Sequence, residues 1–455
     1  MQHIGGDRPP ICFYMLFMRE KLINRAIKVL EDNFQDGGFT IPSKGLYPFQ
    51  WKWDSGFIAL GFAHYDLKKA KIEVETLLDA QWENGFIPHI VFHTDSDSYF
   101  PGPDFHQSNL HPQSSKKYRS TGMTQPPVMG FILERLLEID KGSDKMLEFI
   151  SKQIDKVYAN HVYFYENRDW KNEGLIYIYH NWESGTDNSP MWDDIWLTMN
   201  PPEYEFERRD TSHVDASQRP SKREYDHYLY IIDVAKKYNY DDAKIAEHSP
   251  FLVLDPLFNS ILIRSNEALI KLYGLLGGND ERIAYLKSKQ QKSIQSLNAK
   301  LYNDELGAYV HFDLRNNRQI PYISSSSFTP LYSGAPDKEK AERLVKTMVQ
   351  KFGGEDRYLC ASFDPTHEKF NPRKYWRGPV WINMNWMLYH GLKRYGYDQL
   401  GQRVKNDSLE LVKNNGFFEY FDSRKANPDA ENSGYGGDNF SWSAALLIDF
   451  LKEES

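Results

Sequence analysis

The stretch NWESGTDNSPMWDD, residues 181–194, places four carboxylates among two tryptophans, with Gly185 between its halves. The second half is typical of a helix start, because Asp187 or Ser189 can cap free backbone N–H groups and Pro190 suits the first helical turn. We therefore expect Asp187 on a loop beside a helix N-terminus, partly enclosed by aromatic surface. An apolar wall there would raise its pKa until the carboxyl donates a proton near neutral pH. The alternative is a plain helix cap with packed tryptophans.

On both sides of this stretch, apolar residues recur with the period of a helix, and strand-like runs are short. About twelve helices in hairpin order favour an all-α fold, the (α/α)6 barrel, in which six inner and six outer helices form a closed double ring with long active-site loops. The helices are expected at Arg19–Asn33, at a stretch ending near His64, and at 67–82, 127–139, 143–158, 222–238, 256–276, 280–302, 337–351, 379–395, 399–414 and 440–453.

No linker or change of composition divides the chain, so residues 19–455 are expected to form one catalytic domain. Residues 1–18 are expected to be a disordered extension or the product of a misplaced start, with Met15 and Met18 as candidate translation starts. The irregular segments 93–126 and 199–220 are long enough to be functional loops. We expect both segments to close over a bound substrate.

Composition limits the class of protein. The 455 residues carry a formal net charge of −8 and no basic tract, which argues against nucleic-acid binding. The two cysteines, Cys12 and Cys360, stand far apart, so neither a disulfide framework nor a structural zinc site is expected, and a cytoplasmic location is the default. There is no run of 18 apolar residues and no signal-peptide pattern, so no membrane span or secretion is expected.

Aromatic residues make up 15% of the chain, and many stand in polar loops beside acids and amides. Flat apolar faces with neighbouring hydrogen-bonding groups suit a sugar ring. One pattern occurs twice, as Trp53-Asp54-Ser55-Gly56 and as Trp182-Glu183-Ser184-Gly185, each time just before a predicted helix. In a ring of helices these loops would meet at one end, although chance can produce one such repeat.

Other chemistries lack their motifs. The histidines of the first quarter do not show the spacing of a metal site, and no cofactor is expected. The chain contains neither a Gly-x-Ser-x-Gly motif nor a phosphate-binding loop. Glycoside hydrolysis instead needs two carboxyl groups. Asp187 is the candidate acid, and Glu419, which follows the Asn415-Gly416 turn among aromatic residues, is the candidate partner. The alternative for Glu419 is an exposed strand carboxylate.

Several motifs in order resemble glycoside hydrolase family 63, within the wider group of (α/α)6-barrel glycosidases that includes trehalases. The resemblance covers nearly the whole chain after about residue 19. The motifs that carry it are Trp51-Lys52-Trp53-Asp54, Glu183-Ser184-Gly185-Thr186-Asp187-Asn188-Ser189, Asp255-Pro256-Leu257-Phe258-Asn259, Tyr375-Trp376-Arg377-Gly378-Pro379-Val380-Trp381, Phe418-Glu419-Tyr420-Phe421 and Phe440-Ser441-Trp442.

This resemblance implies an inverting glycosidase in which Asp187 is the general acid and Glu419 the general base, without a metal. Inversion requires carboxyl groups about 6.5–9.5 Å apart, so that a water fits between them and the sugar. The resemblance also implies a sugar subsite lined by Trp53, Asp54, Trp182, Trp376, Arg377 and Trp381.

The compact length is similar to that of the mannosylglycerate and glucosylglycerate hydrolases of this family. That subgroup implies a glycerate site formed by Tyr47, Gln125, Arg219, Tyr225 and Tyr375, in which the guanidinium faces the carboxylate. The segment Gly434-Tyr435-Gly436-Gly437-Asp438 departs from the larger polar residues expected there, which leaves the identity of the sugar open.

The expected partner is therefore a small glycoside, with a homo-oligomer possible. Three alternatives stay open. The first is an α-glucosidase on short oligosaccharides or a trehalase-like enzyme without glycerate preference. The second is a non-catalytic sugar-binding protein. The third is a sugar epimerase that would rely on His64 or His390.

Overall fold

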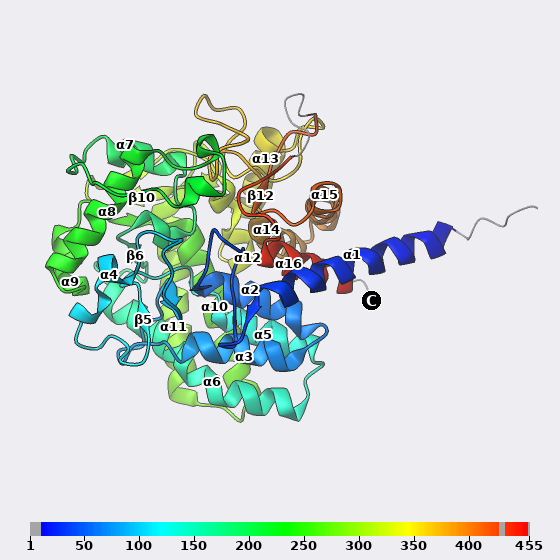
Figure 1. Ribbon diagram of the computed structural model, residues 1–455, viewed down its shortest axis with the longest axis horizontal. Coiled ribbons are helices and arrows are strands. Elements are labelled where there is room, and N and C mark those ends of the chain that lie inside the picture. The colour runs from blue at the N-terminus through cyan, green and yellow to red at the C-terminus, as the bar shows by residue number, and fades with distance from the viewer. Residues whose placement is uncertain (1–10, 427–432, 454–455) are drawn as a thin grey trace, which may run out of the picture.

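The computed structural model describes residues 11–426 and 433–453 and is built mainly from helices, with strands of only two or three residues (Figure 1). Six helices form an inner ring in which each packs against the next and α16 packs against α2. In chain order these are α2 (Lys52–Ala63), α5 (Met129–Ile139), α10 (Pro256–Leu275), α12 (Pro330–Ser333), α14 (Ile382–Arg394) and α16 (Ser441–Lys452).

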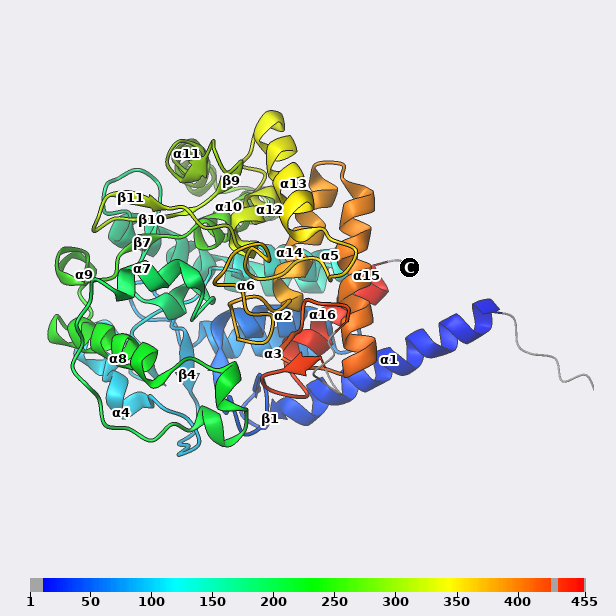
Figure 2. The ribbon, with the colours of Figure 1, turned by 90° about the horizontal axis from the view of Figure 1, so that it is seen from above.

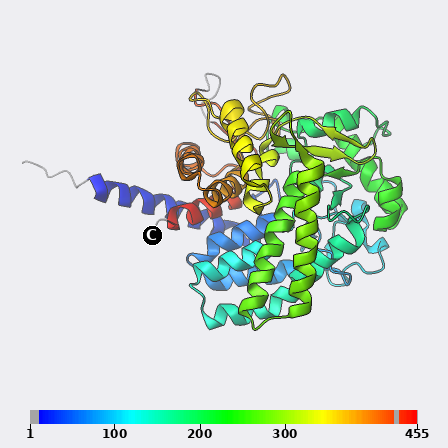
Figure 3. The same cartoon turned by 180° about the vertical axis from the view of Figure 1, so that it is seen from behind.

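Six of the described helices outside this ring form its outer layer, and Figure 2 shows α11, α13 and α15 along the upper and right-hand side of the molecule. The outer helices are α1 (Ile11–Asn33), α3 (Leu67–Leu78), α6 (Asp144–Tyr163), α11 (Asp280–Ser296), α13 (Lys338–Phe352) and α15 (Asp398–Asn415). The long pair α10 and α11 runs side by side on the face seen in Figure 3. The expected all-α double ring is thereby confirmed.

Burial explains which helices are inside. Every residue of α2 is buried, because a helix enclosed by neighbours has no face left for polar residues. Close approach also needs small side chains. A Cβ at Gly61 of α2 would lie 2.6 Å from Ala445 of α16, so only glycine permits this contact.

One helix of the inner ring was not anticipated. The helix expected at 222–238 forms as α8 (Lys222–Lys237), but it packs beside α9 (Asp242–His248) instead of joining the ring. The inner position belongs to α12, which follows a 3-10 turn at Ser325–Phe328. A four-residue helix that begins at a proline and ends before Gly334 is too short to produce a periodic pattern.

The helix expected to begin at Arg19 begins at Ile11. That residues 1–18 are a disordered extension or the product of a misplaced start stays a prediction. No glycine or proline interrupts residues 11–33, so nothing in the chain stops the helix there. Residues 1–10 lie outside the described part of the chain. Within the described part, no helix combines the length and the apolar character needed to cross a membrane.

The strands form small antiparallel sheets in the loops that lead into the inner helices. One sheet joins β3, β4 and β5 (Gln50–Trp51, Ile90–Phe92, Arg119–Ser120), with Gln50 opposite Val91. A second has the order β11-β10-β7-β6 (Arg318–Ile320, His311–Asp313, Val253–Leu254, Tyr177–Ile178). Three pairs complete the set: β12 with β13 (Tyr420–Phe421, Gly434–Tyr435), β1 with β2 (Phe34–Gln35, Phe39–Thr40) and β8 with β9 (Tyr302–Asn303, Ala308–Tyr309).

The two long segments are partly ordered by short elements. Residues 93–126 include α4 (Pro103–His106) and β5, and residues 199–220 follow α7 (Asp193–Trp196) with 3-10 turns at Asp210–Ser212 and Ala216–Gln218. The rings of Phe100 and Phe206 stack with centroids 5.1 Å apart and so join the two segments. Both segments contribute to the cavity described next.

Candidate active site

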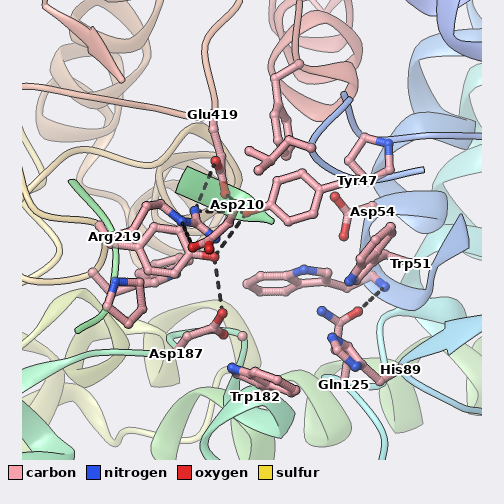
Figure 4. A pocket seen from close by; sticks show the side chains of 18 of the residues that line it. Tyr47, Trp51, Asp54, His89, Gln125, Trp182, Asp187, Asp210, Arg219 and Glu419 are labelled. Atoms are coloured by element: carbon pink, nitrogen blue, oxygen red, sulfur yellow. Dashed lines mark hydrogen bonds and ion pairs between the residues drawn. The ribbon is translucent and has the colours of Figure 1, made fainter. Parts of the chain in front are cut away.

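A cavity of about 760 Å³ opens where the inner helices begin (Figure 4). The first turn of α2 supplies Trp53 and Asp54, and the loop before α14 supplies Tyr375, Trp376 and Trp381. Its mixture of aromatic and polar groups is that of a small-molecule site. Twelve of the thirteen site residues expected from sequence line it: Tyr47, Trp53, Asp54, Gln125, Trp182, Asp187, Arg219, Tyr225, Tyr375, Trp376, Trp381 and Glu419.

Asp187 lies on a tightly shaped loop. A 3-10 turn, Asn181–Ser184, ends at Gly185, whose φ of 73° and close contact with the Trp53 ring both require glycine. Pro190 starts the following 3-10 turn as expected, but neither Asp187 nor Ser189 caps it with a side chain. The expectation of a helix cap was therefore wrong, because the Asp187 carboxylate turns away into the cavity. There its Oδ2 atom lies 3.1 Å from the Tyr375 hydroxyl.

Burial raises the pKa of Asp187 to about 7, and the negative charge of Glu419 acts in the same direction. The positive charge of Arg219 and the hydrogen bond with Tyr375 oppose this rise. The result is a carboxyl group that still carries a proton near neutral pH. This is the condition that the apolar surroundings of residues 181–194 led us to expect.

Glu419 reaches the cavity from the loop before β12 and is 2% exposed, which rules out the exposed strand carboxylate. It accepts hydrogen bonds from the Tyr47 hydroxyl at 2.9 Å and from the Gly437 N–H at 3.1 Å. The Arg219 guanidinium lies 3.7 Å away. Burial raises the pKa of Glu419, whereas Arg219 and these two donors lower it. Glu419 thus has more groups that stabilise its ionised form than Asp187 has.

Two tyrosines connect the carboxylates, which face the same space in Figure 4. The hydroxyl oxygens of Tyr47 and Tyr375 lie 3.4 Å apart. Together with the 3.1 Å and 2.9 Å contacts to the acids, this limits the separation of Asp187 Oδ2 and Glu419 Oε1 to about 9.4 Å. The limit falls inside the range of roughly 6.5–9.5 Å typical of inverting glycosidases.

Arg219 stands beside both tyrosines and is buried. Its Nη1 atom donates to the Tyr47 hydroxyl at 3.0 Å, and its guanidinium lies over the Tyr375 ring at 4.3 Å. Its Nε atom donates to Asp210 at 3.2 Å. Asp210 was not anticipated, because the irregular segment around it has no periodicity that would show which way its side chain points.

The two acids of the repeated Trp-acid-Ser-Gly pattern have different surroundings. Asp54 faces the cavity, and no other side chain of the described residues donates a hydrogen bond to it. Burial raises its pKa well above the usual range. Glu183 points away from the cavity and pairs with Arg168 at 3.1 Å. The two copies of the repeat therefore do not occupy equivalent places in the ring: residues 53–56 lie in the first turns of the inner helix α2, whereas residues 182–185 form a loop turn before α7, and only one of the acids belongs to the site.

Arg377 is the exception among the expected site residues, since it is not part of the cavity lining. Its two terminal nitrogens donate to the carboxylate of Asp193 at 2.9 and 2.7 Å. It also donates to the backbone oxygen of Asn188 at 3.2 Å. The bidentate pair holds the Arg377 guanidinium against residues 188–193. Arg377 therefore joins two loops, and the expected contact between Arg377 and the sugar is wrong.

Further residues line the cavity without having been singled out as site residues. Trp51, Phe440 and Trp442 belong to aromatic motifs already noted, so composition was a usable signal for them. Tyr99 and Phe100 come from the long segment 93–126, where no pattern distinguishes them. The remaining additional lining residues are Pro42, Leu46, His89, Gly185, Asp210 and Pro220.

Comparison with known proteins agrees with this architecture. The model of the mannosylglycerate hydrolase MGH1-like glycoside hydrolase domain matches residues 47–443. Mannosylglycerate hydrolase MGH1 of Selaginella moellendorffii is 40% identical over 95% of this chain and 86% of its own length. The glucosylglycerate hydrolase of Mycolicibacterium hassiacum is 31% identical over 96% and 98%.

Among solved structures, the family 63 mannosylglycerate hydrolase of Thermus thermophilus in complex with Tris and D-glycerate superposes with a TM-score of 0.86. It shares 39% identity over 94% of this chain and 99% of that one. The fold and these comparisons define a glycoside hydrolase built on a double ring of helices. The chain belongs to the MGH1-like glycoside hydrolase family.

Proposed function

We propose that this enzyme hydrolyses mannosylglycerate, glucosylglycerate or both, with inversion at the anomeric carbon. The observation that carries the proposal is the hydrogen-bonded series Asp187, Tyr375, Tyr47, Glu419. In this series the Tyr375 hydroxyl donates to Asp187 and the Tyr47 hydroxyl donates to Glu419, so each acid has one tyrosine as its donor. Burial raises the pKa of Asp187 to about 7, so this carboxyl can hold a proton near neutral pH. Because Arg219 and the Gly437 N–H favour an ionised Glu419, we assign the proton to Asp187.

This distribution of charge fits the chemistry of inversion. Asp187 transfers its proton to the glycosidic oxygen as the bond to the anomeric carbon breaks. Glu419 accepts a proton from a water molecule, whose oxygen attacks that carbon from the opposite face. The products are the sugar with inverted configuration and glycerate, and no step requires a metal ion or a cofactor. A later exchange of protons with solvent restores the two carboxyl groups.

The sugar is assigned to the part of the cavity walled by tryptophans. The Trp376 and Trp381 rings stack 3.7 Å apart, and the Trp53 ring lies 6.3 Å from Trp376. Such faces suit the C–H surface of a sugar, and Trp182 extends them. Asp54, which has no donor from another side chain of the described residues, would accept sugar hydroxyls.

Glycerate is assigned to Arg219 and its neighbours. The guanidinium is the group suited to a carboxylate, because it can donate two parallel charge-assisted hydrogen bonds. Tyr47, Tyr375 and Tyr225 surround it in the cavity, and Gln125 completes the set. The names of the Selaginella, Mycolicibacterium and Thermus relatives support the same aglycone.

The decisive experiment is proton NMR of the full chain with α-mannosylglycerate, α-glucosylglycerate, maltose and trehalose. Release of glycerate with the β-anomer appearing first supports the proposal. Preferential cleavage of maltose or trehalose would instead identify an α-glucosidase or a trehalase-like enzyme. Binding without turnover of any compound would identify a non-catalytic sugar-binding protein.

Replacing Arg219 with alanine should change selectivity more than it changes catalysis in general. We expect kcat/KM for glucosylglycerate to fall about ten- to a hundredfold more than kcat/KM for glucosylglycerol, which carries a hydroxymethyl group in place of the carboxylate. The expected ratio corresponds to a charge-assisted hydrogen bond of roughly 1.5–3 kcal/mol. Steady-state kinetics with the two substrates measures it. Equal losses of kcat/KM on the two substrates would show that Arg219 does not bind the carboxylate of glucosylglycerate.

Activity should decline as the pH rises above neutral. The general acid must carry its proton, and burial places the pKa of Asp187 at about 7, so each further pH unit removes most of the active form. On the acid side, activity should fall as Glu419 gains a proton. A profile of kcat against pH from 5 to 9 tests this. The alkaline decline should vanish in Asp187→Asn, and a flat wild-type profile above pH 7 would contradict the assignment.

Three wider expectations belong to the proposal. Residues 19–455 are taken as one catalytic unit that works in the cytoplasm, and light scattering of the full chain tests for self-association. Residues 93–126 and 199–220 are predicted to close together over the substrate, since Phe100 and Phe206 stack. Protection of both segments from protease by glucosylglycerate would support closure, and unchanged cleavage would count against it.

A further inference from the structure

The ring has a second cavity at the end opposite the active site. Helices α14 and α16 begin beside the active cavity and end beside the second one, which His390, Arg394 and Glu453 help to line. Along α14, Trp381 lines the active cavity, and Trp386 and His390 line the second cavity about 8 and 14 Å further along the helix axis, at 1.5 Å per residue. The second cavity has a volume of about 290 Å³. A single water needs only about 10–15 Å³ of such volume, so the cavity has room for a molecule larger than water.

Four buried polar atoms around this cavity have no hydrogen-bond partner among residues 11–426 and 433–453. They are Arg135 Nε, Arg264 Nη1, His390 Nε2 and Glu453 Oε2. Buried polar atoms are nearly always paired, and leaving one unpaired costs roughly 1–3 kcal/mol. Two guanidinium nitrogens and an imidazole nitrogen beside a carboxylate oxygen suit a ligand that both donates and accepts hydrogen bonds. Burial also lowers the pKa of His390 to about 3, so its ring is neutral and can donate or accept.

The charges at this cavity are already matched, which argues against an anion. Arg135 donates to Asp449 at 3.1 Å, and Arg264 donates to Glu134 at 2.5 Å. Arg394 forms two hydrogen bonds with the Glu267 carboxylate, at 2.8 and 2.7 Å. Each guanidinium therefore faces a carboxylate, and an anionic ligand would meet no unopposed positive charge. The unpaired atoms instead suit hydroxyl groups, which both donate and accept.

Aromatic rings form part of the wall. The rings of Trp386 and Phe131 stack with centroids 6.0 Å apart and an interplanar angle of 25°. Tyr332 meets both of them edge to face, and His390 lies 4.3 Å from the Trp386 ring. The Phe131, Trp386 and Tyr332 rings are 1–6% exposed because they pack on one another, so they form the floor of the cavity and polar groups supply most of its free surface.

We propose that this cavity is a second binding site, separate from the active site, for a neutral polyhydroxy molecule of monosaccharide size. His390 then has a role in binding at the end of the ring opposite the active site, about 12 Å along α14 from the start of that helix. His64 is also at this end, where it pairs with Asp449 at 2.8 Å. The two histidines on which an epimerase would depend are thus both distant from the active cavity.

The test uses the full chain labelled with 5-fluorotryptophan, in the Asp54→Ala background that weakens sugar binding in the active cavity. The fluorine resonance of Trp386, assigned with Trp386→Phe, should shift as D-glucose is added and should not respond to inorganic phosphate. His390→Phe keeps a ring of similar shape but removes the unpaired nitrogen. It should weaken the apparent affinity for glucose at least tenfold, and Glu453→Gln should weaken it severalfold.

The matched control is His248→Phe, since His248 stacks on Tyr238 in an exposed position and should leave the titration unchanged. In the otherwise unaltered enzyme, His390→Phe should keep kcat within about twofold of its normal value, which also shows that the variant folds. If the fluorine resonance of Trp386 did not shift when glucose is added, the proposal would be overturned. A response to phosphate, or an unchanged glucose affinity in both His390→Phe and Glu453→Gln, would overturn it as well.

Discussion

Replacing Asp187 with asparagine should lower kcat on glycerate glycosides by about a thousandfold, within the range of 10²–10⁴ typical of general acid catalysis. Asparagine keeps the shape of the protonated acid and can still accept the hydrogen bond from Tyr375, so the loop should keep its structure. What it loses is the proton for the departing oxygen. The same variant should therefore lose less than about tenfold on the α-glycosyl fluoride, because fluoride leaves without protonation.

Glu419→Gln is the matched control for this prediction. A base that activates water is needed whichever group departs, so this variant should be slow on the fluoride and on the glycerate glycoside alike. Steady-state kinetics of both variants on both substrates checks the two roles together. If Asp187→Asn lost as much activity on the fluoride as on the natural type of substrate, its assignment as the acid would fail.

Replacing Glu183 with glutamine should give the largest loss of stability, about 3–5 kcal/mol, as expected when one partner of a buried ion pair is removed. Glu183 is fully buried and accepts from Arg168, from the Thr124 N–H at 3.1 Å and from the Tyr179 N–H at 2.9 Å. An amide brings an N–H₂ group against these donors and leaves Arg168 with less compensation. Urea denaturation followed by circular dichroism measures the free energy of unfolding.

A surface pair provides the comparison. Asp356 bonds Arg357 at 3.0 Å, but its side chain is 72% exposed. Asp356→Asn should therefore leave the free energy of unfolding close to that of the unaltered protein. If Glu183→Gln lowered the free energy of unfolding as little as Asp356→Asn, the buried ion pair would not be what fixes the position of residues 181–194.

Sequence patterns predicted the helices well because helical periodicity is local. The expected helix at 337–351 appears as Lys338–Phe352, and that at 399–414 as Asp398–Asn415. Local capping was less reliable. Asp187 was expected to cap a helix, but its carboxylate contacts Tyr375, a residue from a different part of the ring. The Asp187 side chain could hydrogen-bond either to nearby backbone or to a residue far along the chain, and the distant partner determined its orientation.

The amino-acid sequence by itself determined that the chain forms paired amphipathic helices, that aromatic loops precede the inner ones, and that Asp187 and Glu419 are candidate catalytic acids. These features depend on spacing and composition, which are properties of neighbouring residues. Only the tertiary structure decided which partners these charged side chains have. Arg377 pairs with Asp193, and Asp210 pairs with Arg219. Glu183 pairs with a residue outside the cavity, so Asp54 is the acid of the repeated pattern that faces the cavity. The physical reason is that each of these charges is placed by a partner remote in the chain, and closure of the helical ring selects that partner.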